Sequence, residues 1–461
     1  MYDQGILSGD AEGNMHPNRA VTRAEFISML NRSFNYMGYR GIALPFADMT
    51  GEEWYADHIR TAYGQGYFSG VSPDRAGATE PITREAAAAM LCRNLKLENE
   101  TLQLTQFLDG ASVGQWARGA VGAAVDKNYL SGYEDNTFRP KNNISRAEAA
   151  TMLSNSLGMI LNNGGVHGNG VIEGNVTIGS TNVELRDAVI TGDLYITEGV
   201  GSGYVNLKNV TVMGEVIVCG GGEGNWGGNS VQFQNCAIQK LTVDGPANRP
   251  VSLFASGNTV VAQTNIKSDA YLQNHPDTPV GFDNIELKGP AETALHLSGN
   301  FNSVDVKMPE NEVVLGKGEI GTLTVDEEAE DSTVQLDRSV VVKNMNLDGA
   351  SSVTGRGDIE NLTVTTEDTE VEMLPDSIEI RPGVTADIAG EEMSSLDAEE
   401  STSGPKILSG YPKADEITSK GAQMLFKTNK PGTIRWALTY ADMEELTEEE
   451  LLKPTTIVRI L

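Results

Sequence analysis

The sequence predicts a multidomain chain: an all-α unit of three repeats, then a right-handed parallel β-helix, then a partial β-sandwich of immunoglobulin or fibronectin type. Sequence motifs recur three times in the first third of the chain, and short alternating β runs separated by Gly, Asn and Asp fill the middle. An acidic segment precedes strand-like runs at the end. At 461 residues the chain is too long for one ordinary hydrophobic core, so several domains are expected.

Composition limits the classes of partner. Lys and Arg number 34 and Asp and Glu number 64, which gives a formal net charge of -30. We therefore expect no nucleic acid and no anionic membrane as partners, because such a surface repels both. No apolar stretch approaches the ~20 residues that a membrane helix needs. Cys92 is predicted to be a small buried residue, and Cys219 could pair with Cys236 only if adjacent strands align them.

The repeat covers residues 1–160 and divides into 1–40, 46–97 and 107–160. Its glycine landmarks are Gly9, Gly70 and Gly132, separated by 61 and 62 positions. A Phe-x-Asp sequence followed by tryptophan occurs twice, with Asp48 and Trp54 and with Asp109 and Trp116. The first repeat lacks this half, so we expect a further segment upstream of Met1.

Each repeat is predicted to contain a helix that begins after Thr22, Thr83 or Ser145. Thr22 with Glu25, and Ser145 with Glu148, form the capping-box pattern, in which the hydroxyl and the glutamate each accept a free backbone N–H. In the middle repeat Glu and Ala exchange places, which loses the box.

An arginine occupies the first helical position in every repeat: Arg23, Arg84 and Arg146. Helix propensity does not require a guanidinium there, whereas a helix N-terminus beside an arginine suits a carboxylate or a phosphate. The alternative is that each arginine pairs with an acid of a neighbouring repeat. Trp54 and Trp116 belong to the core, or present a stacking face to a sugar, or both.

These motifs resemble the S-layer homology (SLH) domain. The resemblance implies a pseudo-threefold prong of helices that binds an anionic, often pyruvylated, secondary cell-wall polysaccharide of Gram-positive bacteria at the cell surface. It also implies that the arginines meet the carboxylate, and that the remaining motif residues shape the grooves between repeats. The predicted polysaccharide-binding residues are Arg23, Arg84, Arg146, Asp48, Asp109, Trp54, Trp116, Gly9, Gly70 and Gly132.

The middle, residues 165–390, predicts a parallel β-helix. Runs such as 183–185, 205–207, 231–233, 251–253 and 285–287 alternate apolar and polar residues, and their spacing of about 20 to 34 positions suits solenoid coils. A second motif occurs at 238–243, 320–325 and 359–364. Residues 391–405 are predicted to be an acidic linker, and 406–461 a partial sandwich that continues past Leu461.

Function is predicted to be non-catalytic, with no catalytic residues and no cofactor. The histidines are scattered without metal spacing, and the acids of the middle region, including Asp187, Asp193, Asp305 and Glu319, read as a solvated face. The solenoid would then be a spacer or an element of a secreted surface layer that self-associates. One alternative is a wall-anchored polysaccharide lyase or glycosidase, favoured by a Lys or Arg cluster on one solenoid face. Another is a surface-layer subunit held together by structural Ca²⁺, favoured by acid pairs at subunit contacts.

Overall fold

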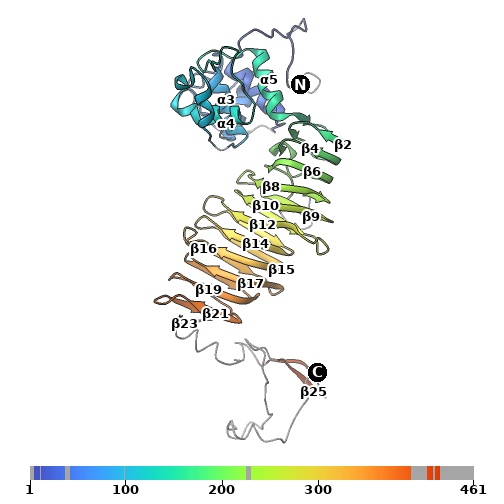
Figure 1. Cartoon of the computed structure of the whole chain (residues 1–461), viewed down its shortest axis with the longest axis vertical. Helices are drawn as coiled ribbons and strands as arrows, with labels where there is room; N and C mark the ends of the chain where they lie inside the picture. Colours follow the sequence, from blue (N-terminus) through green and yellow to red (C-terminus); the bar gives the residue numbers. More distant parts are fainter. Residues whose placement is uncertain are drawn as a thin grey trace, which may run out of the picture.

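A helical unit and a long β-solenoid form most of the molecule (Figure 1). The computed structural model describes residues 5–10, 12–36, 42–97, 99–224, 230–395, 413–418 and 421–425. Within this part of the chain no helix is long and apolar enough to cross a membrane. The α-helices are α1 (Arg23–Ser33), α2 (Ala56–Gly64), α3 (Arg84–Asn94), α4 (Arg118–Asp126) and α5 (Arg146–Leu157). The 3₁₀ helices are η1 (Leu102–Gln106), η2 (Gly110–Ser112), η3 (Gln115–Ala117) and η4 (Glu198–Val200).

The three repeats meet in a closed ring of backbone hydrogen bonds. The N–H of Val21 donates to the carbonyl of Ile144 at 3.1 Å, that of Ile144 to Ile82 at 3.0 Å, and that of Ile82 to Val21 at 2.9 Å. These apolar side chains are buried. Each sits two positions before the first residue of α1, α3 or α5, so the ring places the three helix starts around a pseudo-threefold centre.

Helix starts and capping follow the sequence prediction. Thr22 and Ser145 each accept the N–H of the glutamate three residues on, and that glutamate accepts the backbone N–H of the cap, so both capping boxes are confirmed. In the middle repeat Thr83 caps α3 alone. Glu85, displaced by the exchange, instead accepts the N–H of Gly114 at 2.9 Å, which ties the middle repeat to the third.

Parallel strands stack into a solenoid of about 11 turns. One column of strands starts from β1 and another from β2, and two long strands, β6 and β15, pass from one column to the other. The strands are β1 (Met159–Leu161), β2 (Gly165–Ile172), β3 (Val176–Ile178), β4 (Val183–Ile190), β5 (Leu194–Ile196), β6 (Val205–Val218), β7 (Val231–Gln234), β8 (Ala237–Val243), β9 (Val251–Ser256), β10 (Val260–Ile266), β11 (Ala270–Asn274), β12 (Gly281–Leu287), β13 (Ala294–Ser298), β14 (Phe301–Val306), β15 (Glu312–Val325), β16 (Ser332–Leu336), β17 (Val340–Leu347), β18 (Ser351–Gly355), β19 (Asp358–Val364), β20 (Glu370–Val371), β21 (Ser377–Ile380), β22 (Thr385–Ile388) and β23 (Glu391–Ser394).

The coils are shorter than the sequence spacing suggested. Successive coils of the β1 column are offset by 16 residues from Leu362 to Ile378, and by 25 from Val216 to Leu241. The run 285–287 belongs to this column, in β12, whereas the other four runs of the first set belong to the β2 column. In both columns every second residue points into the solenoid core, so alternation alone could not separate them. In the first coils of the β1 column the residues between are buried as well, for example Thr177 and Tyr195.

The solenoid reaches beyond both predicted limits. At its start β1 pairs with β3, so the first coil begins at Met159 rather than at 165. At its end β23 pairs antiparallel with β22, so Glu391–Ser394 continue the sheet instead of opening a linker. The immunoglobulin-like sandwich is not supported: of residues 406–461 the structure describes only an antiparallel pair, β24 (Lys413–Thr418) and β25 (Gly421–Leu425), and the rest lies outside the described residues.

The helical unit packs directly on the first coils. Outward-facing Ile160, Tyr195 and Ile217 of the solenoid belong to the same buried cluster as the helices. The hydroxyl groups of Tyr129 and Tyr195 lie 2.9 Å apart. The two units therefore share a hydrophobic core.

Candidate functional site

The first backbone N–H groups of α1, α3 and α5 are hydrogen-bonded to backbone carbonyls of a neighbouring repeat. In α1 the N–H of Arg23 donates to Glu80 at 2.9 Å and that of Ala24 to Ala78 at 2.8 Å. The same two bonds recur from α3 to residues 142 and 140, and from α5 to residues 19 and 17. With the cap hydroxyl on the third N–H, the first turns carry no free donors at these positions. The sequence-based idea of an open helix N-terminus for an anion is wrong, because the first N–H groups of each helix are bonded to carbonyls of another repeat.

Each arginine reaches across the seam to the loop of the next repeat. Arg23 is 9% exposed, and its Nη1 donates to the carbonyl of Gly77 at 2.6 Å. Its Nη1 also lies 3.7 Å from the Glu80 carboxylate. Burial lowers the pKa of Arg23, and the Glu80 charge opposes that effect. The guanidinium of Arg23 thus contacts one backbone carbonyl and lies near one acid.

Arg84 is enclosed most completely. It is 6% exposed, and its Nη2 donates to the carbonyl of Ser131 at 2.6 Å. Its guanidinium carbon lies 5.0 Å from the ring centre of Tyr133 and 4.9 Å from that of Phe138, within cation–π range. Glu148 is 3.6 Å away. The Nε of Arg84 is buried and has no hydrogen-bond partner in the described part of the chain.

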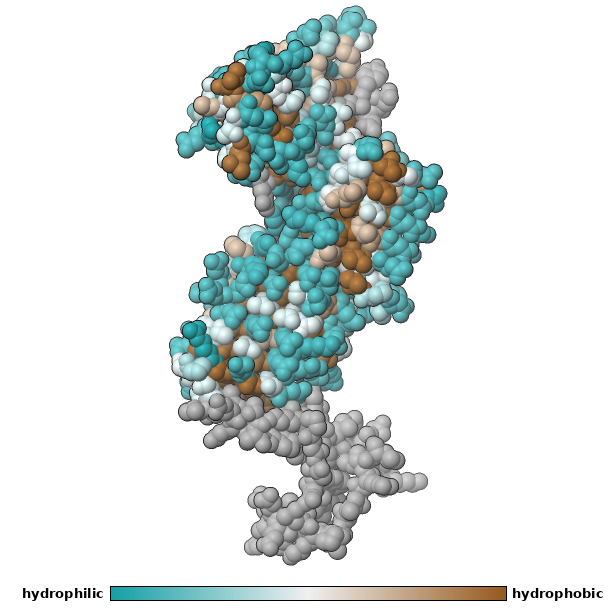
Figure 2. Space-filling view, viewed as in Figure 1, coloured by the Kyte–Doolittle hydropathy of each residue, from teal (hydrophilic) through white to brown (hydrophobic). Residues whose placement is uncertain are grey.

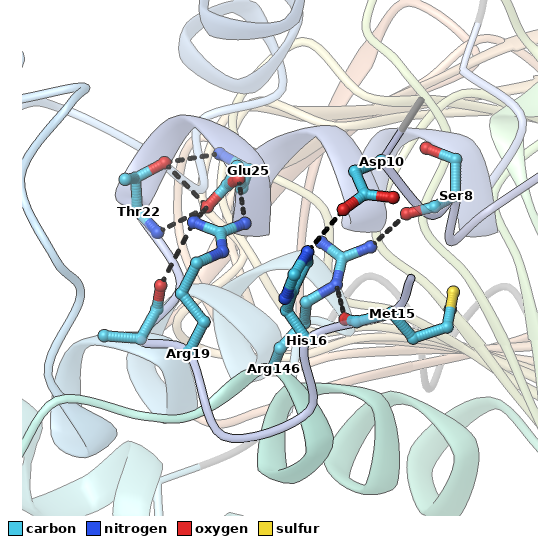
Figure 3. A network of polar contacts seen from close by, with 9 residues as sticks. Ser8, Asp10, Met15, His16, Arg19, Thr22, Glu25 and Arg146 are labelled. Atoms are coloured by element: carbon cyan, nitrogen blue, oxygen red, sulfur yellow. Dashed lines mark hydrogen bonds and ion pairs between the residues drawn. The ribbon is translucent and has the colours of Figure 1, made fainter. Parts of the chain in front are cut away.

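Arg146 closes the ring onto the first repeat, and Figure 3 shows it beside Ser8 and Met15 of that repeat. It is the most accessible of the three arginines. Its Nε donates to the carbonyl of Met15 at 2.9 Å, and its Nη2 donates to that of Ser8. Nearby, Asp10 accepts from His16 at 2.5 Å and from the N–H of Asn14 at 2.7 Å. These bonds lower the pKa of Asp10 to about 2. Asp10 thus organises the loop of the repeat that lacks the Phe-x-Asp half.

The motif aspartates hold the loops that the arginines contact. The two carboxylate oxygens of Asp48 accept the N–H groups of Ala76 and Gly77, both at 2.8 Å. Asp109 accepts those of Phe138 and Arg139 at 2.7 and 2.8 Å. Burial opposes the charge on Asp48, but the two backbone bonds outweigh it and lower its pKa. Each aspartate therefore fixes a loop within its own repeat.

The motif glycines allow a phenylalanine ring to approach the chain. A Cβ on Gly132 would lie 2.4 Å from the Phe107 ring, and one on Gly70 would lie 2.6 Å from the Phe46 ring. Gly70 also has a φ of +89°. Gly9 has no such phenylalanine, and its Cβ would meet the Gly13 backbone at 2.7 Å. The glycines thus set the shape of the loops, and their effect on any groove is indirect.

The two motif tryptophans are largely exposed. Trp54 is 63% exposed and Trp116 56%. Trp54 packs edge-on against Tyr55, at 5.4 Å between ring centres, which leaves much of the indole open to solvent. Of the two sequence-based readings, a purely core role is excluded, and a stacking face remains.

A ladder of lysines runs along the solenoid. Lys267, Lys288 and Lys307 each follow a strand of the β1 column, and the N–H of each bonds to the coil before, at 2.7 to 2.9 Å. This lysine ladder was not predicted from the sequence. Its signal is a recurring triplet of polar residue, apolar residue and lysine: Asn-Ile-Lys at 265–267, Glu-Leu-Lys at 286–288 and Asp-Val-Lys at 305–307.

The three cysteines are unpaired and wholly or partly buried. Cys92, Cys219 and Cys236 are free thiols, so the pair 219–236 is not formed. Burial raises the pKa of Cys92 and of Cys219 to about 12, and that of Cys236 to about 11. Among the described residues no group of three or more His, Cys, Asp or Glu could hold a metal ion.

Comparison with known proteins supports the resemblance of the repeats. The S-layer homology domain model matches residues 1–27, 45–88 and 106–150, one segment in each repeat. The helical unit therefore consists of S-layer homology repeats, and a β-solenoid follows them.

Similar curated proteins share this region. The amylopullulanase of Thermoanaerobacterium thermosulfurigenes is 34% identical over 154 residues, 32% of this chain and 8% of that protein. The cellulosome-anchoring protein of Acetivibrio thermocellus is 32% identical over 160 residues, 33% of this chain and 35% of that protein. The surface-layer 125 kDa protein of Lysinibacillus sphaericus is 29% identical over 160 residues, 34% of this chain and 13% of that protein. The chain thus matches only a small part of each relative's length.

A solved structure, the chitinase ChiW of Paenibacillus sp. str. FPU-7, aligns with 41% of this chain and 16% of its own. The sequence identity is 23% and the TM-score 0.34. A likeness of this size supports no argument about function.

Proposed function

We propose that the protein is a non-catalytic cell-surface protein. In this proposal its S-layer homology repeats bind an anionic, pyruvylated secondary cell-wall polysaccharide, and its solenoid serves as a spacer or as a self-associating element of a surface layer. The observation that carries the proposal is the cyclic seam, in which each repeat's arginine meets the glycine-shaped loop of the next. Cell-wall anchoring itself follows from the repeats, and the charge and identity of the polymer are the proposed part.

The arginines retain capacity for a carboxylate. A guanidinium has five N–H donors, and the structure uses one in Arg23, one in Arg84 and two in Arg146. A pyruvyl carboxylate entering the seam would take the remaining donors in a charge-assisted pair. Arg146 is the most accessible of the three, so the seam between the third and first repeats is the most open.

The tryptophans offer the sugar rings a surface. Exposed indole faces outside a core are the usual partners of pyranose rings, which have an apolar face of their own. Trp54 belongs to the second repeat and Trp116 to the third, so the first repeat contributes none of this kind. In a chain of net charge -30, such local contacts rather than the overall field must hold an anionic polymer.

Exposed residues give the cleanest test. Trp54→Ala and Trp116→Ala should each weaken co-sedimentation with native cell walls about fivefold, since one stacked ring contributes on the order of 1 kcal/mol. Leu102→Ala, which also removes an exposed apolar side chain from the helical unit, is the matched control and should bind normally. Arg146→Ala should weaken binding about ten- to a hundredfold.

The result that would contradict the proposal is equal sedimentation with walls whose secondary polymers have been extracted by acid. Chemical removal of pyruvyl groups tests the finer point: retention of full affinity would exclude the carboxylate as the recognised group. Melting temperatures of all variants are compared, because Arg23 and Arg84 are built into the seam and their removal should also destabilise the helical unit.

A polysaccharide lyase is the second candidate, and the lysine ladder is the observation that favours it. Burial raises the pKa of Asp305, which lies next to this ladder. A lyase, however, needs a base that loses its proton near neutral pH. The hydrogen bond from Lys307 to Asp326 raises the pKa of Lys307 instead. Lys307, held by Asp326, is therefore poorly suited to removing a proton.

A further inference from the structure

A cleft of about 370 Å³ lies where the helical unit meets the solenoid. We call it the joint cleft. Its volume is within the range of about 300–1,000 Å³ found for small-molecule sites. Five lysines line it, in a protein whose acids outnumber its bases almost two to one: Lys96, Lys127, Lys240, Lys267 and Lys288. The helical unit supplies two of them and the solenoid three.

Most of these lysines are neutralised by carboxylates. The pairs are Lys96 with Asp244 at 2.7 Å, Lys127 with Asp193 at 2.9 Å, Lys240 with Glu215 at 3.2 Å, and Lys288 with Glu286. Lys96 takes Asp244 from across the joint, and Asp244 occupies the ladder position one coil before Lys267. Lys267 is left without an ion pair or hydrogen bond from its side chain in the described part of the chain.

Next to this cation is an unsatisfied acceptor. Asn265 lines the same cleft, is 7% exposed, and its Oδ1 is buried without a hydrogen-bond partner among the residues described. Asn265 lies between Thr242 and Glu286 in the strand register, and Lys267 follows it by two positions. Buried polar atoms are nearly always satisfied in native proteins, so this oxygen marks a place for a donor from outside the chain.

The remaining lining groups define the ligand's chemistry. Five carboxylates also line the cleft, those of Glu100, Asp126, Asp193, Glu215 and Asp244, so a polyanion or a phosphate dianion would be repelled by them. A ligand with one negative charge and several hydroxyl groups fits better. Its charge would meet Lys267, one hydroxyl would donate to Asn265, and the others would bond to the carboxylates and ammonium groups of the ion pairs.

We propose that the joint cleft is a second, separate saccharide site that binds an acidic sugar carrying a single carboxylate, such as a uronic acid residue. The site does not depend on the wall-binding seams of the repeats, since none of its lining residues belongs to them. Because its walls come from both units, an occupied cleft also bridges the anchor and the solenoid.

The experiment is calorimetric titration of the full chain with galacturonic acid and with its trisaccharide, which distinguishes a free sugar acid from a polymer segment. Galactose, which lacks the carboxylate, and inorganic sulfate, which lacks hydroxyl donors, are the comparison ligands. Lys267→Gln should weaken binding of the acidic sugar about ten- to a hundredfold. Lys307→Gln, at the same ladder position two coils on and outside the cleft, should leave it unchanged.

Asn265→Leu separates binding from stability. Since the amide oxygen is unsatisfied in the free chain, this variant should keep or raise the melting temperature while losing affinity for the acidic sugar. Three results would overturn the proposal: no heat of binding for either acidic ligand, equal loss in Lys267→Gln and Lys307→Gln, or equal affinity for sulfate. Binding that survives Arg146→Ala but not Lys267→Gln would place the ligand in the cleft rather than in the seams.

Discussion

Replacing Asp48 by alanine should unfold the helical unit at a markedly lower temperature. The change removes two charge-assisted hydrogen bonds of 2.8 Å, to the N–H groups of Ala76 and Gly77. Ala76 is fully buried, so its donor would be left unsatisfied at about 1–3 kcal/mol, and the loss at Gly77 adds a similar amount. A total of about 2–6 kcal/mol corresponds to a fall of roughly 5–25 °C for a unit of this size.

The same substitution should weaken wall binding, because the loop that Asp48 holds also carries the carbonyl that Arg23 contacts. Helix content is followed by circular dichroism at 222 nm, since the solenoid is β structure and the chain need not unfold in one step. Asp109→Ala is the repeat-equivalent change and should give a similar shift. Asp57→Ala, which removes an exposed carboxylate paired with Arg60 of its own helix, should shift the midpoint by less than about 2 °C.

Low pH should destabilise the helical unit in the same way as the Asp48→Ala substitution. The folded pKa of Asp48 lies below its unfolded value, so its contribution is complete above the unfolded pKa and is lost as pH falls through the folded pKa. The wild-type chain should therefore lose helix stability below about pH 4, and the pH dependence should be shallower in Asp48→Ala. A midpoint that is unchanged by the mutation at pH 7, or an acid profile identical to wild type, would refute this reasoning.

Three other outcomes are expected. Thr22→Ala and Ser145→Ala should each destabilise the helical unit by about 1 kcal/mol in urea unfolding, and Thr83→Ala by less because that cap has no reciprocal glutamate; equal losses would contradict the capping-box assignment. The thiols should resist a disulfide reagent at pH 8 until denaturant is added, since burial raises the pKa of all three; fast reaction of the native chain would show otherwise. Polygalacturonate incubated with the full chain should yield no unsaturated ends, and steady turnover abolished by Lys307→Ala would favour the lyase.

Local signals in the sequence were reliable where the interaction is local. The caps at Thr22, Thr83 and Ser145 placed three helix starts correctly, because a cap bonds to residues two or three positions away. The acceptors of the first N–H groups of these helices were not predictable, because those carbonyls belong to another repeat. The aspartates are an intermediate case: the Phe-x-Asp motif was visible, but its partners lie 28 to 30 positions on.

Register limited the prediction of the solenoid. Alternation identified strands but could not assign Ile285 to a column, and one misplaced run lengthened the apparent coil. The lysine ladder depends on the same information, because Lys267, Lys288 and Lys307 become neighbours only when coils of 21 and 19 residues are stacked. Asn265 reads as an ordinary outward polar residue until the helical unit is placed over it.

The joint between the two units bears directly on the anchoring proposal. A linker of flexible residues would let the solenoid pivot on its anchor. Here the hydroxyl of Thr197 donates to the carbonyl of Phe34 at 2.7 Å, and the side-chain amide of Asn35 donates to the carbonyl of Gly179 at 2.6 Å. These contacts hold the end of α1, the helix that begins with Arg23, against the first coils. The direction of the solenoid is thus fixed by the same helix that carries a proposed wall contact. A polymer bound in the seam would therefore orient the whole solenoid relative to the wall, which a surface-layer element requires and a tethered enzyme does not.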